Sequence, residues 1–152
     1  MNKKYLNLFK EVVQSLAKQS HCVSYKVGCV IVKEGRIIST GWNGTFPNTI
    51  NCDEKFPDYD PSIPEQREAH HEYSEISEIH AEMNAIIFAA RSGIAIKDSE
   101  IVCSLQPCNN CLKNIIQAGI KSIYYINDYP RSNYDKYILE YIKNNNITLM
   151  KI

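Results

Sequence analysis

His80-Ala81-Glu82 and Pro107-Cys108-Asn109-Asn110-Cys111 are the two stretches that decide the fold of this 152-residue chain. An imidazole and two thiolates supply three tetrahedral ligands for Zn²⁺, and three protein ligands leave a fourth position open, as in catalytic rather than structural zinc sites. A carboxylate beside that open position can take a proton from water. The two stretches therefore predict a catalytic zinc site, with His80, Cys108 and Cys111 as ligands and Glu82 as the base.

Each stretch also has the features of a helix start. Apolar residues predominate over 83–90 and Gly93 follows, which predicts a buried helix that begins at His80. Pro107 is suited to the beginning of a second helix over 108–117, which should end near Gly119. The positive end of a helix dipole stabilises thiolates, so we expect the two cysteines of the second helix to have a lowered pKa.

Parts of this pattern have simpler explanations. Cys108 and Cys111 alone also fit a redox pair or half of a structural zinc ribbon, and His80 alone fits a core histidine. A structural site has no need of a carboxylate two residues after its histidine, so Glu82 favours catalysis. A zinc-stabilised binding module without catalysis is the alternative from a different functional class.

The rest of the chain alternates between strands and helices. An amphipathic helix is predicted over 3–19 and a last helix over 135–143. Strands are predicted over 27–32, 37–40, 101–105, 122–126 and 147–152, and the first two are joined by a turn at Gly35. The pattern predicts one domain with an α/β fold, a three-layer α/β/α sandwich around a five-stranded mixed sheet.

One long segment interrupts this alternation. Periodicity disappears over residues 42–78, which hold four of the six prolines. Because so long a loop within a compact domain is usually functional, we expect a functional loop insertion here. Cys29, within the first predicted strand, is expected to be a buried thiol.

Charge and composition exclude several classes of partner. Lys and Arg number 17, Asp and Glu also number 17, and no basic run stands out, which argues against binding to long nucleic acid. The amphipathic N-terminus differs from a signal peptide, and no apolar stretch approaches the length of a membrane span. We therefore expect a cytoplasmic protein whose six cysteines are metal ligands or core thiols rather than disulfides.

Taken together, the chain resembles the deoxycytidylate (dCMP) deaminases of the cytidine deaminase superfamily, particularly the phage-encoded members, from about residue 20 to residue 129. The motifs that carry the resemblance are Cys22-Val23-Ser24-Tyr25-Lys26-Val27-Gly28, Gly41-Trp42-Asn43-Gly44, Asn51-Cys52-Asp53, Glu78-Ile79-His80-Ala81-Glu82-Met83-Asn84-Ala85 and Leu105-Gln106-Pro107-Cys108. Two details depart from the usual pattern, since tyrosine is commoner at Trp42 and a threonine-rich version is usual at 104–106.

The resemblance implies zinc-dependent hydrolytic removal of the 4-amino group of dCMP, giving ammonia and dUMP for thymidylate synthesis. Glu82 would pass protons to ring N3 and to the leaving amine. Deaminases of dCTP, cytidine or an adenosine in tRNA share this chemistry and stay open as alternatives. The neutral charge balance argues against tRNA, and the matches at 22–28 and 51–53 favour dCMP.

The resemblance also implies a set of substrate contacts. The backbone around Ala81 and Leu105 would hold the pyrimidine edge, Asn43 would contact the sugar, and Tyr125 or Tyr129 would stack on the base or sugar unless it serves only for packing. A 5′-phosphate needs hydrogen-bond donors. The first candidates are Ser24 and Lys26, although Lys26 fits a solvated charge equally well, and the second candidates are Arg131, Ser132 and Tyr134.

A second group of residues matches a further zinc site of some phage members, namely Cys22, Cys52, His70 and Glu78. Four protein ligands close the coordination shell, so this second zinc would be structural and would hold the long segment in place. His71 is a competing donor beside His70.

Finally, the resemblance implies a homo-oligomer, commonly a hexamer, that dCTP activates and dTTP inhibits, with Mg²⁺ possible alongside these triphosphates. The matching positions for effector or subunit contacts are Gly41, Trp42, Gly44, Phe88 and Arg91. Arg91 suits a triphosphate or a carboxylate, and it is also simply a favourable cation at a helix C-terminus.

Overall fold

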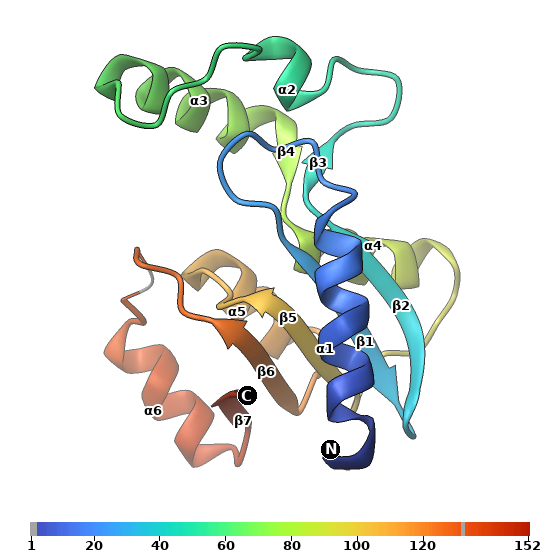
Figure 1. Ribbon diagram of the computed structural model, residues 1–152. Coiled ribbons are helices and arrows are strands. Elements are labelled where there is room, and N and C mark those ends of the chain that lie inside the picture. Colours follow the sequence, from blue (N-terminus) through green and yellow to red (C-terminus); the bar gives the residue numbers. More distant parts are fainter. Residues whose placement is uncertain (1–2, 132) are drawn as a thin grey trace.

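A computed structural model describes residues 3–131 and 133–152. The chain forms a five-stranded mixed sheet between two layers of helices (Figure 1). The strands lie in the order β2 (Arg36–Trp42), β1 (Gly28–Lys33), β5 (Glu100–Leu105), β6 (Ser122–Asn127) and β7 (Thr148–Lys151). β1 is antiparallel to both β2 and β5, whereas β5, β6 and β7 run parallel to one another. The predicted fold class and its opening hairpin are confirmed.

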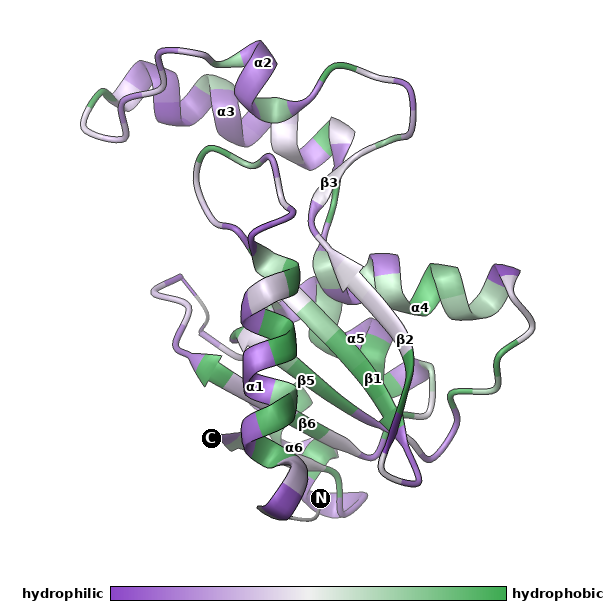
Figure 2. Ribbon diagram, turned by 45° about the vertical axis from the view of Figure 1, so that its right-hand side comes forward, coloured by the Kyte–Doolittle hydropathy of each residue, from purple (hydrophilic) through white to green (hydrophobic). Residues whose placement is uncertain are grey.

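Each face of the sheet is covered by helices that bury apolar side chains. On one face α1 (Lys3–Ala17) packs Phe9 and Val13 against Val30 and Val102. On the other face lie α4 (Ala81–Arg91), α5 (Asn109–Gln117) and α6 (Lys136–Asn144), which share a core with the sheet. β1 is buried from both sides and is therefore hydrophobic along most of its length (Figure 2).

The segment predicted as an irregular loop is partly helical, so that prediction is wrong over residues 64–77. It contains β3 (Gly44–Thr45), α2 (Cys52–Lys55), α3 (Pro64–Ser77) and β4 (Glu78–Ile79). α2 and α3 stand beyond one end of the sheet (Figure 1), and α3 lies largely in solvent, with His70 as its buried residue. A mostly exposed helix needs no apolar stripe, so the hydrophobic pattern gave no sign of it.

Within the described residues, no helix has the length and apolar character needed to cross a membrane.

Candidate active site

The two decisive stretches meet as the N-termini of two helices. His80 precedes α4 as its N-cap residue, with extended backbone angles of φ −64° and ψ 152°. Cys108 is the N-cap of α5, where its Sγ accepts a hydrogen bond from the backbone N–H of Cys111 over 3.4 Å. The second helix therefore begins just after Pro107 and Cys108, and the first turns of both helices converge.

Three side-chain atoms are placed as a tetrahedral metal requires. His80 Nδ1 lies 3.3 Å from the Sγ of Cys111 and 3.6 Å from the Sγ of Cys108. Two ligands of a tetrahedral zinc, one sulfur and one nitrogen, are separated by about 3.6 Å, given the usual Zn–S and Zn–N distances. The three residues therefore fit one zinc ion with a fourth position left open.

The same residues polarise one another. Hydrogen bonds from the Cys111 thiol and from His80 lower the pKa of Cys108 to about 4, which makes it a thiolate. The interaction with Cys108 raises the pKa of His80 to about 9, and the same thiolate raises the pKa of Cys111 well above its usual value. The lowered pKa expected for both cysteines is therefore found for Cys108 and is wrong for Cys111, whose thiol donates to the Cys108 thiolate. Binding of a divalent cation would displace protons from His80 and Cys111, as is usual for thiolate and imidazole ligands.

Glu82 lies in the first turn of α4, two residues after His80. Its side chain is buried, with 4% of the residue exposed, and this burial raises the pKa of the carboxyl group. A buried carboxyl group with a raised pKa is a better proton acceptor than an exposed one and can return the proton later in the same reaction.

Glu82, His80 and Cys108 open onto a cavity of about 340 Å³. It lies between the C-terminal end of β5, the connection before β1, and α3. Among the predicted substrate contacts, the cavity is lined by Ser24, Asn43, Ala81, Leu105, Tyr129 and Arg131. The structure thus gathers these six residues, far apart in the sequence, around the predicted base.

Asn43 and Tyr129 help to shape this cavity. The side-chain amide of Asn43 accepts a hydrogen bond from the N–H of Val27 and donates one to the carbonyl of Tyr25, each over 2.8 Å. Tyr129 donates its backbone N–H to Gln106 Oε1 over 3.1 Å, and its ring meets the ring of Tyr25 edge-on at 5.4 Å. The two tyrosines therefore form one wall, held by two amide side chains.

Other predicted contacts lie elsewhere. Lys26 lies on the wall of a separate hollow with Gln14 and Asp128, and Tyr125 packs against the core under α5 and α6. The hydroxyl of Tyr134 donates to the carbonyl of Pro107 over 2.8 Å. Ser132 lies outside the described residues.

Arg67 is a cavity residue that sequence reasoning missed. It belongs to α3, which the hydrophobic pattern did not predict, so no signal in the sequence placed it near Glu82. His71 also lines the cavity, rather than joining the second cluster with His70.

The second cluster is assembled from four separate elements. Ligand atoms of Cys22, Cys52, His70 and Glu78 lie within 4.8 Å of one another, and Cys22 Sγ is 3.5 Å from His70 Nε2. Glu78 Oε1 is buried without a hydrogen-bond partner, an arrangement that is costly unless a cation is bound. This orphaned oxygen and the four-donor set fit a closed structural zinc site.

Burial disfavours the charged forms of the cluster. It raises the pKa of Cys22 to about 12, raises the pKa of Cys52, and lowers the pKa of His70. Beside the cluster, His21 Nδ1 and Asp53 Oδ2 are 2.8 Å apart, and the N–H of Asp53 donates to the carbonyl of His21. The chain after α1 is thus joined to α2 next to both cysteines.

The residues predicted for effector or subunit contacts divide into two groups. Gly41 is buried against α4, and a Cβ atom at this position would lie 2.1 Å from the carbonyl oxygen of Ala81. Trp42 and Phe88 are exposed, and the Arg91 guanidinium lies 5.4 Å from the centre of the Phe88 ring. A Cβ atom at Gly44 would meet open space.

Comparison with known proteins places the chain among deaminases. Residues 3–127 match the family described as the cytidine and deoxycytidylate deaminase zinc-binding region. The chain is 37% identical over 149 residues to the deoxycytidylate deaminase of Enterobacteria phage T2, covering 80% of this chain and 79% of that protein. For the phage T4 deoxycytidylate deaminase the identity is 36%, with 80% and 77% covered.

A solved structure extends this similarity to the whole chain. The dCMP deaminase of cyanophage S-TIM5, in complex with dCMP and dUMP, superposes with a TM-score of 0.76 at 28% identity, covering 100% of this chain and 99% of that one.

Proposed function

Because this chain belongs to the cytidine and deoxycytidylate deaminase family and is a deaminase, we propose that it hydrolyses dCMP to dUMP and ammonia. The observation that carries the proposal is one cavity lined by two of the three zinc ligands, His80 and Cys108, by the buried Glu82 and by two arginines. Its product, dUMP, would then supply thymidylate synthesis. The similarity to phage enzymes named for this reaction supports the proposal.

The residues of the cavity divide the chemical work. A zinc ion held by His80, Cys108 and Cys111 supplies Lewis acidity and makes water acidic at neutral pH. Glu82 takes up the first proton of the attacking water and delivers it to ring N3 as the C4–O bond forms. It then takes the second proton, from the hydroxyl group now on C4, and passes it to the amine, which leaves as ammonia when the C4–N bond breaks. The backbone at Ala81 and Leu105 orients the pyrimidine edge, and Tyr129 lies beside the base or sugar.

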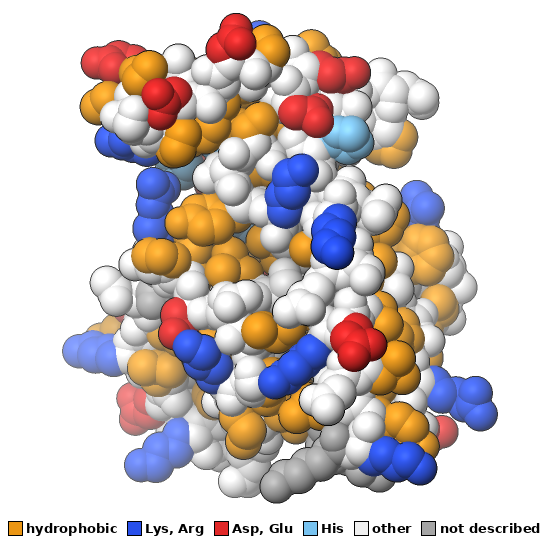
Figure 3. Space-filling view, in the orientation of Figure 1, with side chains coloured by type: hydrophobic (Ala, Val, Ile, Leu, Met, Phe, Trp, Pro, Cys, Tyr) orange, Lys and Arg blue, Asp and Glu red, His pale blue; other side chains and the backbone are white. Residues whose placement is uncertain are grey.

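Arg67 and Arg131 are suited to bind the 5′-phosphate. They reach the cavity from α3 and from the connection after β6. Acidic side chains gather over α2 and α3 (Figure 3), and Arg67 is the single Lys or Arg of α3. Its Nη1 donates to the carbonyl of Pro61 over 2.6 Å. Two guanidinium groups provide planar, bidentate donors for a phosphate, and Ser24 adds a hydroxyl.

We expect Arg131→Ala and Arg67→Ala to raise KM for dCMP by about tenfold or more, since a hydrogen bond to a charged group contributes about 1.5–3 kcal/mol. KM for deoxycytidine, which lacks the phosphate, should stay nearly unchanged. Steady-state kinetics with both substrates make the comparison. Arg36→Ala, on the exposed end of the β1–β2 hairpin, is the control. Equal changes of KM for dCMP and deoxycytidine would contradict the phosphate assignment.

We also propose that the chain forms a homo-oligomer, with a hexamer as the expected form. In this proposal dCTP activates the enzyme, dTTP inhibits it, and Mg²⁺ accompanies the triphosphates. Exposed Trp42 and Phe88 support a contact between subunits on this side of α4, where Asn84 Nδ2 donates to the carbonyl of Trp42 over 2.7 Å. Arg91 beside Phe88 offers a cation for a triphosphate or for a carboxylate of another subunit.

The test of the proposed function is ammonia release by zinc-loaded protein from dCMP, dCTP, deoxycytidine and CMP, each with and without dTTP. We expect turnover of dCMP above that of the other three and its suppression by dTTP. Faster turnover of dCTP would assign the triphosphate as substrate instead. No release from any of them would favour a zinc-stabilised binding module.

A further inference from the structure

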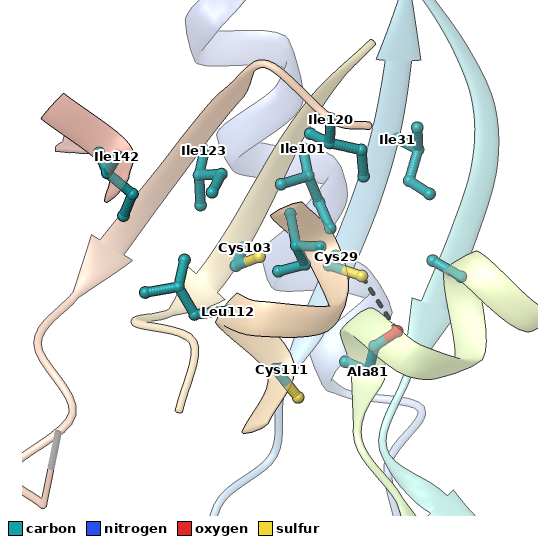
Figure 4. Close-up of a cluster of buried hydrophobic side chains, with 12 residues drawn as sticks. Cys29, Ile31, Ala81, Ile101, Cys103, Cys111, Leu112, Ile120, Ile123 and Ile142 are labelled. Atoms are coloured by element: carbon teal, nitrogen blue, oxygen red, sulfur yellow. Dashed lines mark hydrogen bonds between the residues drawn. The ribbon is translucent and has the colours of Figure 1, made fainter. Parts of the chain in front are cut away.

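The carbonyl group of Ala81 has an additional contact from the sheet. Cys29, on β1, is fully buried, and its thiol donates a hydrogen bond to the Ala81 carbonyl oxygen over 3.1 Å (Figure 4). Ala81 is the first residue of α4 and lies between the zinc ligand His80 and the base Glu82. The carbonyl of a helical residue already accepts the N–H four residues on, so the thiol is a second donor and is not needed to satisfy this oxygen.

Gly41 contacts the same carbonyl group. Gly41 on β2 is the direct partner of Cys29 in the antiparallel pairing. A Cβ atom at Gly41 would lie 2.1 Å from the Ala81 oxygen and 2.7 Å from the backbone nitrogen of Ala85. The first turn of α4 therefore rests on the backbone of β2 with no side chain between them.

A third contact lies one helical turn further along. The hydroxyl of Ser39, which is 3% exposed, donates to the carbonyl oxygen of Ala85 over 2.7 Å. Cys29, Ser39 and Gly41, which we call the α4 seat, thus contact the backbone of two successive turns of the helix. All three residues are buried, so the contacts exclude water.

We propose that Cys29 is a positioning residue for deamination, which acts through the Ala81 carbonyl and with the rest of the α4 seat to fix the first turn of α4 above the sheet. The proposal rests on the function proposed above. Because His80 and Glu82 flank Ala81, a shift of this turn moves both side chains together. A displacement of about 1 Å in an active site can lower the rate by about 100-fold.

The test compares alanine and serine at position 29. We expect Cys29→Ala to lower kcat for dCMP by about tenfold with little change in KM, because a partial loss of orientation affects the reacting geometry rather than binding. Cys29→Ser keeps a donor and should recover most of kcat. If the thiol served only as a small apolar group, kcat would be higher for alanine than for serine, since a buried hydroxyl is costlier than a methyl group. Higher kcat for alanine than for serine would therefore overturn the proposal.

Cys103 provides the matched control, because it lies opposite Cys29 on β5, is equally buried and contacts the Cys29 side chain, whereas the hydrogen bond to the Ala81 carbonyl comes from Cys29. Cys103→Ala should lower the melting temperature without lowering kcat, and an equal loss of kcat at both positions would also count against the proposal. Deuterium exchange over residues 81–91 gives a readout that needs no activity. Exchange should be faster in Cys29→Ala and unchanged in Cys103→Ala, even if the parent protein failed to deaminate dCMP.

Discussion

Replacing Glu82 with glutamine is expected to lower kcat for dCMP by about 10³-fold, within the range found when a general acid–base group is removed. Glutamine has nearly the shape of glutamate but cannot take up a proton from water. The Glu82 carboxyl is buried, and this burial raises its pKa, so a neutral amide of the same size is compatible with this position. The fold and the zinc content of the variant should therefore match those of the parent.

The measurements for this variant are ammonia release, zinc per chain by metal analysis, and the melting temperature. Glu75→Gln is the matched control, because Glu75 lines the same cavity on exposed α3. It should keep kcat close to that of the parent. Loss of zinc or of folding in Glu82→Gln would show that the carboxyl group serves structure rather than proton transfer.

The grouping of His80, Cys108 and Cys111 was predictable because its signals are local. His80 and Cys108 each lie at the start of a helix. The three-residue spacing of Cys108 and Cys111 places these two cysteines in one helical turn. The boundaries of α4 and α5 follow from the apolar run and from Gly93 and Gly119, both of which have positive φ. Hydrophobic periodicity in the remaining strands then predicts the sheet and its two covered faces.

The walls of the cavity were less predictable because they depend on contacts between distant segments. Arg67 could not be placed without α3, whose exposed and polar surface lacks a hydrophobic pattern. Lys26 was a candidate for the phosphate site because it follows Ser24 closely, yet the two line different hollows. Side chains two residues apart in an extended segment share a direction only where the segment is regular.

Cys52→Ser is expected to lower bound zinc from two ions to one per chain and to destabilise the fold by about 2–4 kcal/mol, because structural zinc binding contributes directly to folding free energy. For a chain of this size such a loss corresponds to a fall in melting temperature of about 5–15 °C. The cluster joins four elements, α1's following loop, α2, α3 and β4, through Cys22, Cys52, His70 and Glu78. Without the metal, Glu78 Oε1 would be left buried and unpaired.

Cys103→Ser separates this role from the general effect of a polar group at a buried cysteine, since Cys103 belongs to neither metal cluster. It should keep two zinc ions per chain. In Cys52→Ser, deuterium exchange should increase over α2 and α3 and remain low in β5 and α5, because the second zinc would hold the inserted segment and the loop after α1 rather than the sheet. At low temperature, where the variant stays folded, KM for dCMP should rise more than kcat falls. The reason is that α3, which forms one wall of the cavity, would be loosened. Unchanged zinc content would contradict a second metal site at this cluster, and the buried carboxylate of Glu78 would then need another partner.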